Sequence, residues 1–140
     1  MEATKNGLFR KRTYWDIALN ALDDAMFGLE NERYCLAALH FHRFAEKGAK
    51  ALLAKTDPQH SLLQSPAIGL ILLAYDPEGY SKNGVMDGAG YLTTLYFGTQ
   101  SPGIGYIELT KEHAETARRF ALQLRQYFEA EIAKDGDGNE

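Results

Sequence analysis

The chain has 140 residues, a length typical of one domain, and 45% hydrophobic and 24% charged residues, a composition typical of globular proteins. Its formal net charge of −4 argues against nucleic-acid binding through the overall charge, although it leaves room for a local basic surface. One cysteine, Cys35, excludes an internal disulfide and a multi-cysteine zinc site and indicates a cytoplasmic protein; we expect it to be buried. The longest apolar run, residues 67–75, is too short to cross a membrane.

Apolar residues recur at helical spacing in the first half of the chain. Thr13 and Asp16 have the spacing of a capping box, which predicts a helix over residues 13–29. Asn31 is the expected N-cap of a second helix over residues 32–55. Small residues that would let another helix approach the second one closely lie at Ala45, Gly48, Ala49 and Ala51.

The second helix is expected to end just before Pro58, and the pattern of apolar residues changes after it. A third, almost continuously apolar helical region is expected from about His60 to Asp76, with Pro66 in its first turn. Residues 77–106 are rich in glycine and are expected to form a connection that contains one short helix, over residues 86–97. The tyrosines of this connection are candidates for core, interface or base-stacking residues: Tyr80, Tyr91, Tyr96 and Tyr106.

Thr110 is the expected N-cap of a last helix over residues 111–133. The polar ends of the chain, residues 1–11 and 134–140, are expected to be flexible tails. No segment alternates like a β-strand, so the sequence predicts an all-α fold in one domain over residues 1–140. Amphipathic helices with mostly short links predict an antiparallel up-and-down bundle of four to five helices.

The histidines match no established catalytic or metal-binding motif. No glutamate stands three residues before a histidine, as a di-iron bundle requires. His42 and Glu46 lie one helical turn apart, and either bind a metal or form a hydrogen-bonded surface pair. His60 either caps the helical region that follows it, packs on it, or acts in catalysis, and His113 is expected to be exposed. We expect no metal and no cofactor.

A line of basic residues follows the second helix. Arg43, Lys47 and Lys50 recur at helical spacing, with Glu46 beside them. One interpretation is a solvated face with a Glu46–Lys50 pair. The other is a contact with an anion, a nucleotide or the RNA backbone, in which these three residues bind phosphate and His42, Glu46 and His60 are candidate polar partners.

Several segments, in order, resemble a known family. Residues 38–53 include Ala-Glu-Lys-x-x-Lys-Ala-x-Leu, and residues 60–62 read His-x-Leu at the start of the next helix. Residues 92–102 and the long helix from residue 111 follow in the expected order. Together these segments resemble the HEPN domain family over residues 13–132.

The resemblance implies a helical bundle that commonly dimerises. Members of the family include RNA-cleaving toxins, partners of minimal nucleotidyltransferases, and non-catalytic modules that bind nucleotides or RNA. The nucleases carry Arg-x4–6-His near the start of the last long helix. Here Gln100 stands where that arginine would be, and no histidine follows within six residues. We therefore expect a cytoplasmic, homodimeric, non-catalytic module without catalytic residues, which binds a nucleotide, RNA or a nucleotidyltransferase.

Two other functions stay open at this point. One is a metal-independent RNase with a rearranged site, in which His60 or His113 is the general acid or base. The other is a structural partner in a toxin–antitoxin-type pair, in which residues 77–106 make the contact.

Overall fold

A computed structural model describes residues 12–82, 84–99 and 108–138, and the expected tail over residues 1–11 lies outside these ranges. The described residues form helices and no strand: α2 (Tyr14–Glu30), α3 (Tyr34–Thr56), the 3-10 turn η1 (Ser61–Gln64), α4 (Ile68–Tyr75), α5 (Pro77–Tyr80), α6 (Val85–Gly98) and α7 (Lys111–Gly138). The all-α prediction is confirmed.

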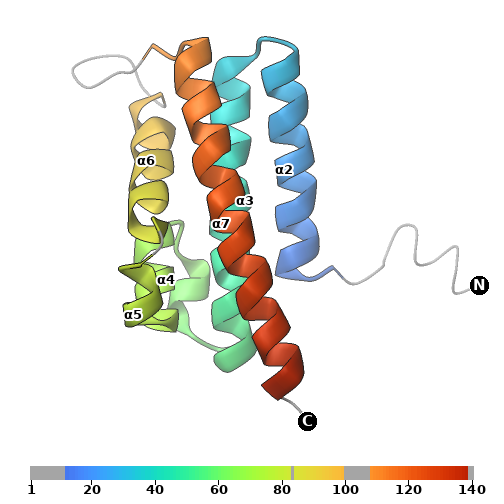
Figure 1. The fold of residues 1–140 in the computed structure, drawn as a ribbon, viewed down its shortest axis with the longest axis vertical. Helices are drawn as coiled ribbons and strands as arrows, with labels where there is room; N and C mark the ends of the chain where they lie inside the picture. Colours follow the sequence, from blue (N-terminus) through green and yellow to red (C-terminus); the bar gives the residue numbers. More distant parts are fainter. Residues whose placement is uncertain (1–11, 83, 100–107, 139–140) are drawn as a thin grey trace, which may run out of the picture.

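Four longer helices run alternately up and down. Figure 1 shows α2 and α6 running in one direction and α3 and α7 in the other, with α4 and α5 at the lower end of the bundle. Helix α3 is central, because it packs against α2, α4, α6 and α7. No helix in the described ranges combines the length and the apolar character that a membrane span needs.

Helix α2 begins as its sequence predicts. The Thr13 hydroxyl accepts a hydrogen bond from the Asp16 amide at 3.0 Å, and the Thr13 amide donates to the Asp16 carboxylate at 3.1 Å. This reciprocal pair satisfies two amides that the helix leaves free at its start.

The prediction that Asn31 caps α3 is wrong. Asn31 closes α2, since its side-chain amide donates to the Phe27 carbonyl at 2.8 Å. The N-cap of α3 is Arg33, whose side chain makes no capping hydrogen bond. Between them Glu32 has a φ of 60°, so the link reverses the chain over too few residues for Asn31 to serve the next helix.

Helix α7 crosses α3 at a glycine. A Cβ atom at Gly48 would overlap the ring of Phe128, so only glycine allows this approach. Trp15 and Phe44 complete the contact, with ring centroids 6.0 Å and 5.7 Å from that of Phe128. The close approach expected from the small residues of this helix is confirmed.

The single helical region expected after α3 consists of two separate elements. His60 caps the turn η1, and α4 begins only at Ile68, so Pro66 lies between the two elements and not in a first helical turn. The expected short helix in the glycine-rich connection is longer, since α6 covers Val85–Gly98 and α5 precedes it. Helix α7 continues to Gly138, past its expected end at residue 133.

Cys35 is exposed, which corrects the expectation that it is buried. The buried face of the first turns of α3 carries Ala37, Ala38 and Phe41. Position 35 points away from that face, because successive helical residues are turned by about 100°.

Candidate functional site

A pocket of about 380 Å³ lies between the first half of α3 and the last turns of α6. Its volume is at the lower end of the range for small-molecule sites. We call it the α3 pocket, and its lining residues are Leu39, His40, His42, Arg43, Glu46 and Tyr96. Tyr96 comes from α6 and the others from α3, so the pocket exists only because these two helices pack together.

His42 is buried beside this pocket. Its ring is 2% exposed and stacks on Tyr96, with ring centroids 4.1 Å apart and planes inclined by 12°. Burial lowers the pKa of His42 to about 4, although Glu46 acts in the opposite direction. At neutral pH the imidazole is therefore uncharged, and its Nε2 atom is buried without a hydrogen-bond partner. A buried polar atom without a partner costs about 1–3 kcal/mol, which a ligand or a water would recover.

Neither expected role of the His42–Glu46 pair is supported. No group of three or more His, Cys, Asp or Glu side chains within the described residues is arranged to hold a metal ion. His42 stacks on Tyr96, and Glu46 instead binds lysines: its Oε2 atom lies 2.8 Å from Lys50 Nζ and 3.6 Å from Lys47 Nζ.

The structure separates the three basic residues that the sequence groups together. Lys50 is 5% exposed, and its ammonium is held by Glu46. Lys47 is half-buried over the ring of Tyr14, on the side of α2, and burial is the main cause that lowers its pKa. Arg43 is exposed, lines the α3 pocket, and forms no ion pair with any other described residue. Of the three, Arg43 is the one available to a ligand in the pocket.

The two other candidate histidines make hydrogen bonds at the starts of helical elements, His60 as the N-cap of η1 and His113 inside the first turn of α7. His60 Nδ1 accepts a hydrogen bond from the Leu62 amide at 3.0 Å, which confirms its expected capping role. His113 Nδ1 accepts from the Thr110 amide at 3.2 Å, and the His113 amide donates back to the Thr110 hydroxyl. His113 is half-buried rather than exposed. Neither histidine lines the α3 pocket.

Tyr96 is the residue of the α3 pocket that was hardest to identify from the sequence. It was one of several tyrosines in a glycine-rich region, and nothing in its local spacing distinguishes it from the others. Its position depends on the packing of α6 against α3, which joins segments about fifty residues apart in the chain.

The comparison with family models identifies the family of this chain. The model of the HEPN domain matches residues 12–131, which is most of the chain. The chain belongs to the HEPN domain family. No single curated protein and no solved structure gives a significant match to it. Gln100, at the position where the HEPN nucleases are expected to have arginine, lies outside the described residues.

Proposed function

We propose that this HEPN domain is a non-catalytic module that binds the phosphate of a nucleotide or of RNA at the α3 pocket. The observation that supports the proposal is Arg43, an exposed residue whose guanidinium belongs to a pocket where the buried His42 stacks on Tyr96. A guanidinium can donate two parallel hydrogen bonds to a phosphate. The unpartnered Nε2 atom of His42 offers one more hydrogen bond, suited to a base edge.

The local charge favours the same class of ligand. Arg43, Lys47 and Lys50 stand against one carboxylate, that of Glu46, so this stretch of α3 carries a net charge of about +2 within a chain of net charge −4. Such a local excess attracts anions, and its effect weakens as salt screens it.

The test is a titration of the purified chain with ATP and with short single-stranded RNA at two salt concentrations. Arg43→Gln is expected to weaken binding about tenfold and to reduce the salt dependence by about one phosphate contact. Arg118→Gln is the matched control, because Arg118 is exposed on α7 and its guanidinium is paired with Glu115. Equal affinity for Arg43→Gln and the native chain would refute the assignment of the site.

The same samples, run on a denaturing gel, test the non-catalytic part of the proposal. We expect the RNA to remain intact. Cleavage that persists after repurification, and that is lost in His60→Gln or His113→Gln, would establish the RNase with a rearranged site instead.

A role in protein–protein contact is also proposed, as homodimer or as partner of a minimal nucleotidyltransferase in a toxin–antitoxin-type pair. Four large apolar side chains on α2, α3 and α6 support it, because they are between 38% and 64% exposed: Phe27, Leu36, Leu39 and Phe97. Sedimentation velocity of the native chain and of Phe97→Ser is the test. A native chain that stays monomeric at high concentration would contradict the homodimer. Failure of a co-expressed minimal nucleotidyltransferase to co-purify with the chain would contradict the pair.

A further inference from the structure

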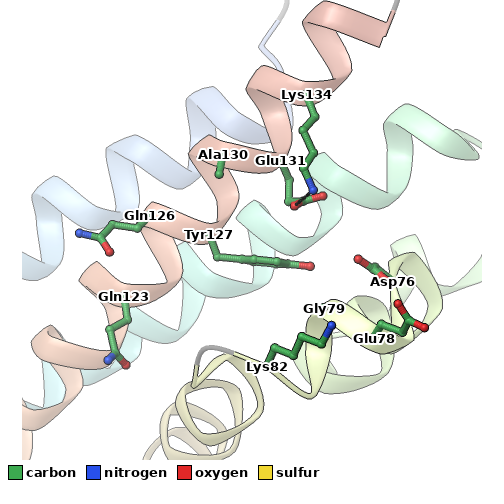
Figure 2. A pocket seen from close by; sticks show the side chains of 10 residues that line it. All are labelled: Asp76, Glu78, Gly79, Lys82, Gln123, Gln126, Tyr127, Ala130, Glu131 and Lys134. Carbon is green, nitrogen blue, oxygen red and sulfur yellow. Dashed lines mark hydrogen bonds and ion pairs between the residues drawn. The ribbon is translucent and has the colours of Figure 1, made fainter.

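A second cavity shares no lining residue with the α3 pocket. It has a volume of about 790 Å³ and opens between α7 and the corner where α4 passes into α5. Figure 2 shows Tyr127, Glu131 and Lys134 reaching into it from α7, opposite Asp76 and Gly79. We call it the α5–α7 cleft.

Glu131 is fixed at one end of the α5–α7 cleft. The Tyr75 hydroxyl donates to its Oε1 atom at 2.8 Å, and Lys134 Nζ donates to its Oε2 atom at 2.9 Å. Glu131 is buried, with 9% of the residue exposed. Both of its carboxylate oxygens have a partner, and its charge is compensated by that of Lys134. It helps to shape the cleft and is not free to bind a ligand directly.

The hydroxyl of Tyr127 has no partner. Its oxygen is buried and makes no hydrogen bond. Burial, together with the carboxylates of Glu131 and Asp76, raises the pKa of Tyr127 to about 12, so the hydroxyl keeps its proton at neutral pH. Native structures rarely leave a buried hydroxyl unsatisfied, since the loss is about 1–3 kcal/mol.

Gly79 packs closely against this hydroxyl and against the Asp76 carboxylate. A Cβ atom at position 79 would lie 2.7 Å from Asp76 Oδ2 and 3.0 Å from the Tyr127 hydroxyl oxygen. Both polar atoms therefore face the same side of Gly79, and a methyl group there would displace them. The Asp76 carboxylate forms no ion pair with any described residue.

The charges around the cleft decide what it can hold. Its carboxylates belong to Asp76, Glu78 and Glu131, and its ammonium groups to Lys82 and Lys134. Since Lys134 is paired with Glu131, negative charge remains in excess beside the Tyr127 hydroxyl. This negative charge would repel an anion and attract a cation.

We propose that the α5–α7 cleft binds a small organic cation, whose ammonium or guanidinium group donates hydrogen bonds to the Asp76 carboxylate and to the Tyr127 hydroxyl oxygen. This site is independent of the phosphate-binding role proposed for the α3 pocket.

Isothermal titration calorimetry of the full chain with spermidine tests the proposal. Asp76→Asn and Tyr127→Phe keep the size of each side chain and are expected to weaken binding about tenfold or more, the loss that follows from removing one hydrogen bond to a charged group. Gly79→Ala is expected to weaken it as well, because the added methyl group would push the Asp76 carboxylate and the Tyr127 hydroxyl out of their positions. Glu129→Gln is the matched control, since it removes a carboxylate from α7 outside the cleft.

Two further arms complete the experiment. N-acetyl-lysine methylamide represents a lysine side chain of a protein, and the tighter of the two amine probes identifies whether a free amine or a protein side chain is the ligand. Citrate tests the sign of the charge. Absence of heat with both amines at millimolar concentration, equal affinity in all variants, or binding of citrate that depends on Asp76 would overturn the proposal. Circular dichroism of each variant confirms that it is folded.

Discussion

Acid is expected to destabilise this protein through His42. The imidazole has a pKa of about 4 in the folded chain and an ordinary value of 6.5, because burial beside Tyr96 disfavours its charged form. Between these two values the unfolded chain binds more protons than the folded one, so the free energy of unfolding falls as the pH falls through this range. The contribution is fully present above pH 6.5.

The size of the effect follows from the difference between the two pKa values. A pKa of about 4 in the folded chain against 6.5 in the unfolded chain corresponds to about 3 kcal/mol of the free energy of unfolding. Of this contribution, about 2 kcal/mol is lost between pH 7 and pH 5. Against a typical domain stability of about 5–15 kcal/mol, such a loss is measurable.

Urea unfolding at pH 7 and pH 5 measures it, on the native chain and on His42→Phe. Phenylalanine keeps a ring against Tyr96 and does not titrate, so the loss between the two pH values should be smaller by about 2 kcal/mol in this variant. His40→Gln removes a neighbouring histidine from α3 and is the control, since it retains the part of the pH dependence that belongs to His42. The same pH dependence in His42→Phe and in the native chain would refute the argument.

Three other substitutions test the packing and the caps by thermal or urea unfolding. Gly48→Ala is expected to destabilise by about 2 kcal/mol, because overlap with Phe128 outweighs the gain of about 1 kcal/mol in helix propensity; a higher melting temperature would contradict the close approach of α7. Tyr75→Phe leaves one oxygen of Glu131 without its donor and should cost about 1–3 kcal/mol, whereas unchanged stability would mean that water replaces the hydroxyl. Thr13→Ala removes the capping box and should cost about 1 kcal/mol, and Thr13→Ser should recover most of it.

The features that the sequence predicts well depend on residues within one or two helical turns of each other. The capping box of Thr13 and Asp16 and the ion pair of Glu46 and Lys50 are of this kind, since helical geometry alone places such residues together. The same holds for the amphipathic stripes that identify the four longer helices. The family resemblance also rested on a local motif, in residues 38–53, and the match to the HEPN domain confirms it.

The features that the sequence did not predict depend on which helices meet. Spacing along α3 puts Arg43, Lys47 and Lys50 on one line, but the packing of α3 buries Lys50 and leaves Arg43 exposed. The stack of His42 on Tyr96 joins α3 to α6.

The α5–α7 cleft likewise needs two segments that are remote in the chain. Its Tyr75–Glu131 hydrogen bond spans 56 residues. Local periodicity determines where a helix forms and which of its faces is apolar, because it follows from backbone geometry. Only the tertiary structure decides which polar side chains lose their water and which partner replaces it, because burial depends on the neighbouring helix and not on the residue's own neighbours in sequence.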